Sequence, residues 1–364
     1  VRTRGASRRS PASVVGAPRV TRSTRSILLA AGLLIGFQIG MMAYEQLAFG
    51  WPFAREEAPL HSGWHWMRRG ISAALCAALV LALARPGLRA EPLSHGARRL
   101  TRLVVALTVA ATILLAASPR IYALVGAEDG AIEWFSALLL FGASGFMAAR
   151  FLNLWRADRA LPYRRLHLLG AAGFALLFLL MGGEEVSWFQ RQIGFDTPES
   201  VAARNWQGEF NLHNFQTDLT ELVLYSGTGL FLMLLPLIRE SDAARWPFVQ
   251  PFAALLPDRT VAAISAPMLV FTYSHWTLLP VQAAFWIGLF ACIAFAGSAV
   301  ATRERALWIG LAVWIAIGQL IHLLLGPTML MMFDSSEYRE LFLSLGLAAY
   351  AFRQWQTGGR LTQT

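Results

Sequence analysis

The feature of this sequence that most constrains its fold is a series of apolar runs, each close to 20 residues long, that recurs along the chain. A run of this length forms a helix able to cross the hydrocarbon core of a bilayer, which is about 30 Å thick. Hydrophobic residues make up 56% of the 364 residues and charged residues only 15%, against about 25% in a typical soluble domain. We therefore interpret the chain as an all-α, polytopic transmembrane helix bundle.

We predict about ten spans, with both termini in the cytoplasm and a long structured outer loop between spans five and six. The predicted spans cover residues 26–48, 70–86, 103–125, 131–153, 166–183, 218–238, 261–278, 281–300, 307–325 and 338–354. Together they form a transmembrane domain over 26–355, whose outer functional loop covers 183–218. Residues 1–25 are rich in Arg, Ser and Pro and are expected to form a disordered basic cytoplasmic tail. A second cytoplasmic tail is expected over 356–364.

The distribution of basic residues sets this orientation. All 31 basic residues are Arg, and 24 of them fall on the side predicted to be cytoplasmic. An excess of Arg in short cytoplasmic loops is the pattern of inner-membrane proteins. The net charge of +9 is thereby explained by loop clusters, so we infer no nucleic-acid partner and place the chain in a bacterial inner membrane. Cys76 and Cys292 lie inside apolar runs and form no disulfide framework or metal motif.

Acidic residues and histidines show the opposite distribution. Sixteen of the 22 acidic residues and five of the seven histidines fall at or beyond the outer face. The rule that places Arg in the cytoplasm says little about acids, so topology does not explain this clustering. It predicts a polar site on the periplasmic face.

Glu184 and Glu185 stand at the outer boundary of the fifth predicted span. Ionisable groups at that depth are costly and usually face the interior of a bundle. If the helix continues to Gln192, Glu184, Trp188 and Arg191 share one face, and Arg191 partly neutralises Glu184. The alternative is a helix end solvated by headgroup water, with Trp188 as an aromatic anchor. Two adjacent carboxylates favour a functional role.

The rest of the outer loop divides into a short helix and a polar ribbon. Gly194 is expected to cap the preceding helix, and Thr197-Pro198-Glu199 to begin a short one that runs to about Arg204. Polar residues then alternate with apolar or small ones, which predicts an extended ribbon with one polar face. These polar residues are Asn205, Gln207, Glu209, Asn211 and His213. Such a face suits a metal, a sugar or a lipid head; the alternative is an edge strand or loop without function, with Asn211 or Asn214 as a helix cap.

Further outer groups extend the candidate site. Glu133 and Glu340 each lie about a turn inside a span, too deep for capping, whereas Asp334 with Glu337 resembles a capping box. Asp218, Glu221 and Tyr225 line one face of the sixth span. His275 and His322 are lone histidines on apolar faces, which are more often hydrogen-bonded core residues than ligands. His61 and His65 have the spacing of a helical pair, but in a loop segment, so they give only a weak metal signal.

The stretches GEEVSWFQRQIGFDTPE and NWQGEFNLHN, within 183–214, resemble a family of bacterial multi-pass membrane proteins of unknown function. The EDG-x-x-E stretch before the fourth span is similar to it as well, although relatives carry a small residue at the position of Phe189. The resemblance implies a shared polytopic fold. A fainter similarity, to alkaline ceramidase-type membrane hydrolases, is one of chemistry only, because their His-x-x-x-His element is absent here.

The leading hypothesis is an enzyme at the periplasmic face, a hydrolase or transferase that acts on a membrane lipid or lipid-linked substrate. Glu184 or Glu185 would be the general base, His213 an acid–base partner, and Arg191 the group that holds a phosphate or carboxylate. The predicted substrate-binding residues are Trp188, Gln190, Asn205, Gln207, Glu209, Asn211, Asn214, Glu133 and Glu340. A divalent metal ion would be held by Glu185, His213 and His322, and Mg²⁺, Mn²⁺, Ca²⁺ and Zn²⁺ all fit these ligand types. The alternatives are a transporter and a non-catalytic scaffold or sensor.

Overall fold

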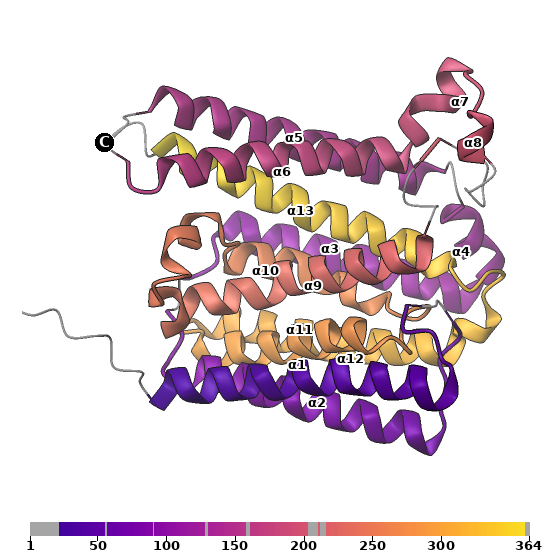
Figure 1. Ribbon diagram of the computed structural model, residues 1–364, viewed down its shortest axis with the longest axis horizontal. Coiled ribbons are helices and arrows are strands. Elements are labelled where there is room, and N and C mark those ends of the chain that lie inside the picture. The colour runs from indigo at the N-terminus through magenta and orange to yellow at the C-terminus, as the bar shows by residue number, and fades with distance from the viewer. Residues whose placement is uncertain are drawn as a thin grey trace, which may run out of the picture.

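The computed structural model describes residues 22–54, 57–89, 91–127, 130–157, 161–202, 210–211 and 216–360. In this part of the chain every regular element is a helix, and the long helices lie side by side (Figure 1). The long helices are α1 (Arg22–Phe49), α2 (Gly63–Ala84), α3 (His95–Ala117), α5 (Ala131–Arg156), α6 (Arg164–Glu185), α9 (Thr217–Glu240), α11 (Leu279–Ser298), α12 (Thr302–Leu325) and α13 (Asp334–Arg360). The short ones are α4 (Pro119–Val125), α7 (Gln190–Ile193), α8 (Glu199–Ala202), α10 (Arg259–Ser265), and the 3-10 helices η1 (Ser187–Phe189), η3 (Asp242–Arg245), η4 (Gln250–Leu255), η5 (Ala266–Val270) and η6 (Gly326–Thr328).

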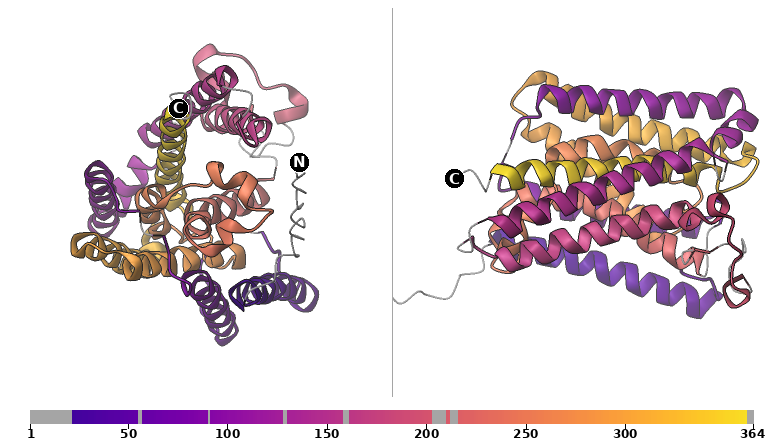
Figure 2. Two further views of the ribbon diagram at one scale, coloured as in Figure 1. Left: turned by 90° about the vertical axis from the view of Figure 1, so that its left-hand side faces the viewer. Right: turned by 90° about the horizontal axis from the view of Figure 1, so that it is seen from above.

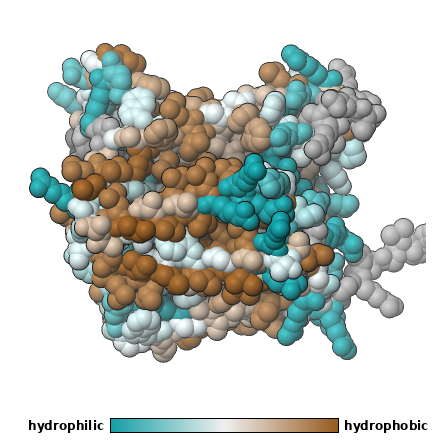
Figure 3. Space-filling model, turned by 180° about the vertical axis from the view of Figure 1, so that it is seen from behind, coloured by the Kyte–Doolittle hydropathy of each residue, from teal (hydrophilic) through white to brown (hydrophobic). Residues whose placement is uncertain are grey.

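Eight of the described helices are long and apolar enough to cross a membrane, namely α1, α2, α3, α5, α6, α9, α11 and α12 with η6. Large apolar side chains on their surfaces are exposed, including Leu29 (65%), Leu169 (72%) and Leu324 (68%). Hydrophobic side chains cover much of the middle of the face seen from behind (Figure 3). Extensive apolar patches of this kind mark surfaces that water does not cover. The fold is that of a multi-pass helical membrane protein.

The seventh and tenth predicted spans are not among these eight helices. The prediction of a continuous seventh span over 261–278 is wrong, because its helical part ends at Val270. The 12 residues of α10 and η5 reach about 20 Å at the rise of these helices, too short for a bilayer core. The tenth predicted span lies inside α13, which has 27 residues but is not among the eight, since Arg339, Glu340 and Arg353 lower its hydropathy.

Other boundaries shift by smaller amounts. The third predicted span is interrupted at Ser118, where α3 ends and Pro119 begins α4. Residues 22–25 form the first turn of α1, so the basic tail predicted over 1–25 otherwise lies outside the described residues. At the other terminus α13 continues to Arg360, past the predicted start of the second tail.

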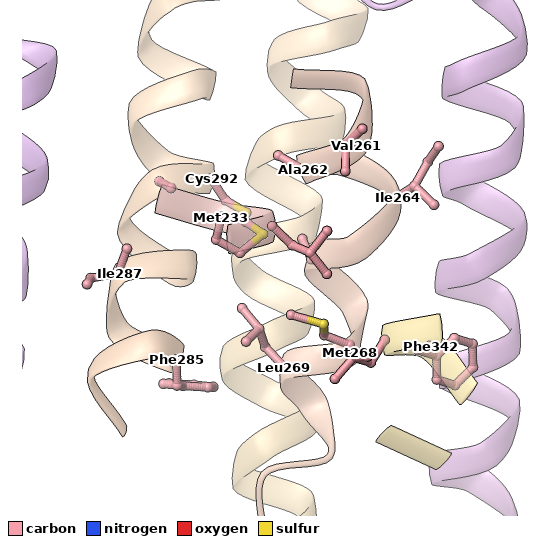
Figure 4. Close-up of a cluster of buried hydrophobic side chains, with 14 of the residues drawn as sticks. Met233, Val261, Ala262, Ile264, Met268, Leu269, Phe285, Ile287, Cys292 and Phe342 are labelled. Carbon is pink, nitrogen blue, oxygen red and sulfur yellow. The ribbon is translucent and has the colours of Figure 1, made fainter. Parts of the chain in front are cut away.

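The segment formed by α10 and η5 lies at the centre of the bundle, in contact with α3, α9, α11, α12 and α13 (Figure 2). Its apolar side chains meet Met233 of α9, Cys292 of α11 and Phe342 of α13 (Figure 4). Glycines let the surrounding helices approach it closely. A Cβ on Gly318 of α12 would lie 2.7 Å from Val270, and Gly288 of α11 and Gly346 of α13 leave equally little room. Small residues at such contacts are typical of helix packing in membranes.

Ion pairs distinguish the two ends of the bundle. At one, which we call the Glu240 end, Arg259 pairs with Glu240 and with Glu304. At the other, which we call the Glu185 end, Arg68 pairs with Glu45 at 2.5 Å and also donates to the carbonyl of Thr277. Arg259 and Thr277 bracket the segment predicted as the seventh span, so the chain does run between the two ends there, although only its first part is helical.

Helix α13 runs from the Glu185 end to the Glu240 end (Figure 1) and packs along α5, which also packs against α6. Near its beginning, the Tyr338 hydroxyl donates to the carbonyl of Tyr122, which belongs to α4, at 2.8 Å. Near its end, the Tyr350 hydroxyl donates to the carbonyl of Leu255 at 2.8 Å. These two contacts fix the position of α13 along the bundle axis, so that its first turns lie at the Glu185 end.

Candidate functional site

The end of α6 folds back on itself directly after the two adjacent carboxylates. Ser187, Trp188 and Phe189 have φ values of 41°, 54° and 63°, in the left-handed region that residues other than Gly rarely adopt. Helix α6 therefore does not continue to Gln192, which is the condition under which Glu184, Trp188 and Arg191 would share one helix face. The turn still brings Trp188 to Glu184, because the indole Nε1 donates to Glu184 Oε1 at 2.8 Å. Arg191 lies beyond the turn, exposed on α7.

Gln190 organises the loop that follows. Its Nε2 donates to Thr197 Oγ1 at 2.5 Å and to the carbonyl of Phe195 at 3.2 Å, and its Oε1 accepts from the amide of Phe210 at 2.7 Å. Gly194, at φ 77°, ends α7 as predicted. The side chain predicted to bind substrate thus holds three points of its own loop together.

Asn211 is the one member of the predicted polar ribbon that the structure describes. Its Nδ2 donates to Ser187 Oγ at 3.2 Å, and both side chains are buried. It therefore fixes the turn after Glu185. Asn205, Gln207, Glu209, His213 and Asn214 lie outside the described residues, so the ribbon stays a prediction. The short helix predicted to reach Arg204 is described as α8, over Glu199–Ala202.

Four carboxylates from three helices gather at the Glu185 end. Glu185 of α6 lies close enough to Glu133 of α5 and to Glu337 and Glu340 of α13 for their charges to interact. All four side chains are half-buried. The structure thus brings Glu133 and Glu340 to Glu185, as the sequence hypothesis requires, and adds Glu337.

Tyr225 of α9 connects these carboxylates to a second group of polar side chains. Its hydroxyl donates to Glu340 Oε1 at 2.5 Å. The Arg339 guanidinium lies over its ring, 4.1 Å from the centroid. The edge of the same ring meets the His275 imidazole, with centroids 4.7 Å apart. A fully buried tyrosine therefore contacts an acid, a cation and an imidazole at once.

His275 stands in a hydrogen-bonded chain that crosses from α9 to α13. Its Nε2 lies 3.0 Å from Glu221 Oε2, and its Nδ1 lies 2.8 Å from Ser274 Oγ. Ser274 Oγ lies 3.0 Å from Ser336 Oγ. His275 and Ser274 are each 1% exposed, in the non-helical segment after η5. An imidazole held between a carboxylate and a hydroxyl is oriented for proton transfer.

Arg339 is the cation of this group. It is 2% exposed, and its Nη1 has no hydrogen-bond partner among the described residues. Its charge interacts with those of Glu340 and Glu221 and with Tyr225. Sequence reasoning counted Arg339 only as one of the outer arginines. The signal that marks it is its position beside Glu340, inside a helix rather than in a loop.

His322 lies apart from the carboxylates. Its Nδ1 contacts the carbonyl of Gly318 at 2.9 Å, and its ring meets Phe271 and Tyr122, with centroids 5.0 and 6.4 Å away. This is the environment of a core histidine. In the part of the chain that the structure describes, no group of three or more His, Cys, Asp and Glu is arranged to hold a metal ion. The metal set of Glu185, His213 and His322 gains no support from His322, and His213 lies outside that part.

The other two outer histidines form contacts near the start of α2. His65 Nδ1 lies 2.7 Å from Ser62 Oγ, which caps α2, and its ring stacks on Trp51. His61 Nδ1 lies 3.3 Å from Arg69 Nη1. Burial and then the Arg69 charge lower the pKa of His61 below its usual range, which keeps it neutral beside the guanidinium near pH 7. We assign these two residues a structural role.

One continuous network therefore occupies the Glu185 end, from Glu185 through Glu340 and Tyr225 to His275 and Glu221. It contains carboxylates, an imidazole, hydroxyls and a buried guanidinium, which are the groups needed for acid–base chemistry on a polar substrate. Comparison of the chain with known protein families, with curated proteins and with solved structures finds no match. The function is therefore inferred from the residues of the site.

Proposed function

We propose that this chain is a multi-pass protein of the bacterial inner membrane, with ten passes and both termini in the cytoplasm. We propose further that the network at the Glu185 end is the active site of an enzyme, a hydrolase or transferase that acts on a lipid or lipid-linked substrate at the periplasmic face. The observation that carries the proposal is the convergence of ionisable side chains from α5, α6, α9, α13 and the 271–278 segment. The similarity of 183–214 to an uncharacterised bacterial family fits the same proposal.

The cost of such a network supports a functional role. Ionisable side chains in membrane helices are expensive and are retained mainly where a pathway or a site needs them. A compact ion-paired group would satisfy a structural requirement, as Arg259 does with Glu240 and Glu304 at the opposite end. At the Glu185 end, four carboxylates surround one region, an arrangement that serves a site more readily than it serves stability.

The geometry supports distinct roles for its members. Glu185 and Glu340 are half-buried and are placed to take a proton from a hydroxyl or water that enters from the membrane boundary. Glu221 orients His275, which accepts the proton of Ser274 or of substrate, in the manner of an acid–histidine–nucleophile group. Arg339 stabilises negative charge that develops on a phosphate or an acyl oxygen.

The direct test is turnover of lipid by the full-length protein. Purified protein would be reconstituted in vesicles of bacterial lipid extract, and lipid species would be followed by mass spectrometry. We expect Glu185→Gln to lower turnover at least about 100-fold, the typical contribution of a general base, with an unchanged unfolding temperature. The matched control is Glu199→Gln, which removes a carboxylate from exposed α8 and should retain full turnover.

His275→Gln tests the second part of the site. It should lower turnover as strongly as Glu185→Gln, because it removes the imidazole that accepts the proton in the proposed site. Turnover that persists in both variants, or wild-type protein that changes no lipid species, would contradict the enzyme proposal.

A transporter is the second candidate, favoured by one specific observation. The chain between Arg259 and Thr277 passes from one end of the bundle to the other as a short helix followed by buried non-helical backbone. Broken helices of this kind hold the substrate sites of many transporters. The same vesicles, loaded with a pH-sensitive dye, would report proton flux. Flux that Glu185→Gln abolishes, with lipids unchanged, would replace the enzyme with a transporter.

A further inference from the structure

A polar cavity lies at the Glu240 end, remote from the network described above. Its volume is about 180 Å³, and it is lined by the ends of α5, α9 and α13 and by the residues that lead into α10. The polar side chains in its wall include Arg150, Arg239, Arg353, Asp258, Tyr350 and Gln354. Sequence reasoning treated this side of the protein as chemically plain.

The charges in the wall do not balance. Arg353 donates from Nε and Nη2 to Asp258 Oδ2, at 2.8 and 2.5 Å, so this pair is neutral. Arg150 donates to the carbonyl of Gln354 and to Thr357 Oγ1, and Arg239 donates to the carbonyl of Leu256. These acceptors carry no formal charge, and the described residues offer neither arginine a carboxylate within ion-pair distance. Two positive charges are left facing one cavity.

Arg150 makes this excess costly. It is 1% exposed, and its Nε has no hydrogen-bond partner among the described residues. Its charge interacts with that of Arg239, and both act on Tyr350. Beside it, Gln354 is 4% exposed and its Oε1 also lacks a partner among the described residues. A buried, unpaired guanidinium is strongly destabilising unless an anion neutralises it.

We propose that this cavity binds a phosphate group, either that of a phospholipid head or that of a soluble phosphate compound. The planar guanidinium fork matches phosphate oxygens, and two arginines neutralise the double charge of a phosphate monoester. A volume of about 180 Å³ holds a phosphate together with several water molecules. Gln354 Oε1 accepts a hydrogen bond from a hydroxyl or ammonium group next to the phosphate.

The depth of the cavity suits either source of phosphate. Arg150 lies six residues before the end of α5, which places it about 9 Å inside that end at 1.5 Å per residue. Lipid headgroups occupy this depth at the boundary of a bilayer. The cavity is separate from the proposed active site, so the proposal of a phosphate site does not depend on the enzyme proposal.

The test measures thermal stabilisation of the delipidated full-length protein in detergent. One series titrates sodium phosphate at constant ionic strength, and the other titrates phosphatidylglycerol in mixed micelles against micelles of detergent alone. Arg239→Gln removes one of the two unpaired charges at a half-buried position. Arg245→Gln is the matched control, because it removes the same charge at the same end from an arginine whose side chain is 71% exposed. Arg150→Lys keeps the buried charge but removes the fork.

We expect a saturable rise in the unfolding temperature of the wild type. Arg239→Gln and Arg150→Lys should weaken the apparent affinity at least tenfold, and Arg245→Gln should leave it unchanged. A response to sodium phosphate identifies a soluble phosphate compound as the ligand, and a response to phosphatidylglycerol alone identifies a lipid head. The proposal is overturned if neither probe gives a saturable rise in the unfolding temperature. It is also overturned if Arg239→Gln binds the probe as tightly as the wild type and the Arg245→Gln control do.

Discussion

At the scale of single residues, the turn after Glu185 is the most constrained feature of the candidate site. Three successive residues other than Gly, Ser187 to Phe189, have positive φ, each at a cost of about 1–3 kcal/mol. Specific contacts hold them there: Asn211 donates to Ser187, Trp188 donates to Glu184, and the Phe189 ring stacks on Phe141 with centroids 5.9 Å apart. Because the strain follows Glu185 directly, the turn fixes where that carboxylate points.

Gly183 is the residue on which this turn depends most directly. A Cβ at this position would lie 2.8–2.9 Å from three carbons of the Trp188 ring, and a rigid ring has to move as a whole. We predict that Gly183→Ala lowers the free energy of unfolding by about 1–3 kcal/mol, the usual cost of overpacking, and shifts the tryptophan fluorescence as the Trp188–Glu184 bond breaks. Gly173→Ala is the control on the same helix, where a Cβ meets open space. Equal stability of the two variants would show that the turn tolerates movement of Trp188.

Residues of the site differ in how far the sequence reveals them. Glu133 and Glu340 are identified by their depth, about a turn inside a span, and Tyr225 by the helix face that it shares with Asp218 and Glu221. Ser274 is not identified from the sequence, and His275 is identified only as a lone histidine of an apolar run, which is usually a core residue. Their partners, Glu221 and Ser336, lie 54 and 62 residues away. A local sequence pattern cannot predict contacts between residues so far apart in the chain.

At the scale of elements, the segment of α10 and η5 explains why hydropathy predicts a continuous seventh helix that the structure does not contain. The run 261–278 is apolar enough to be predicted as a helix. Hydropathy, however, does not show whether the backbone amides and carbonyls form the hydrogen bonds of a helix. Beyond Val270 some of the backbone hydrogen bonds close local turns, such as the one from the Trp276 amide to the Tyr273 carbonyl at 3.1 Å. Others go to neighbouring helices: the amide of Thr272 donates to Gln319 Oε1 at 3.1 Å, and the carbonyl of Thr277 accepts from Arg68. Irregular backbone at membrane depth survives only with such partners.

Close packing around this segment gives the prediction at the same scale. Gly318 of α12 faces Val270, whose two methyl carbons would lie 2.7 and 2.9 Å from an added Cβ. We predict that Gly318→Ala destabilises the protein by about 1–3 kcal/mol and moves the Ser274–His275 pair, which begins four residues after Val270. Gly310→Ala, on the same helix but with no atom within 4 Å of the added Cβ, should be neutral or stabilising by up to about 1 kcal/mol. Thermal unfolding in detergent compares the two, and a neutral Gly318→Ala would contradict the packing described here.

At the scale of the whole molecule, the arginine count predicts an orientation that the two ends of the bundle can test. Helix α1 begins and α13 finishes at the same end (Figure 1), as an even number of passes requires. The residues predicted to be periplasmic, including α7 and α8, lie at the opposite end, with the carboxylate network (Figure 1). The orientation is predicted from the sequence alone because loop charge is a local property, and it stays a prediction. The break in the seventh pass is not predictable from the sequence, since it depends on partners from other helices, among them Arg68 of α2 and Gln319 of α12.

Cysteine accessibility gives the last prediction. The native Cys76 and Cys292 are both 0% exposed, so the unmodified chain serves as the blank for a membrane-impermeant maleimide. Glu199→Cys on α8 and Arg245→Cys on η3 place single exposed thiols on either side of α9. In intact spheroplasts we expect Glu199→Cys to react and Arg245→Cys to react only after permeabilisation, because α9 crosses the membrane between them. Reaction of Arg245→Cys alone would invert the orientation and move the acidic site to the cytoplasmic face. Reaction of both thiols from outside would mean that α9 does not cross the membrane. That result would contradict the bundle described here, in which α9 is an apolar helix of 24 residues with one buried face.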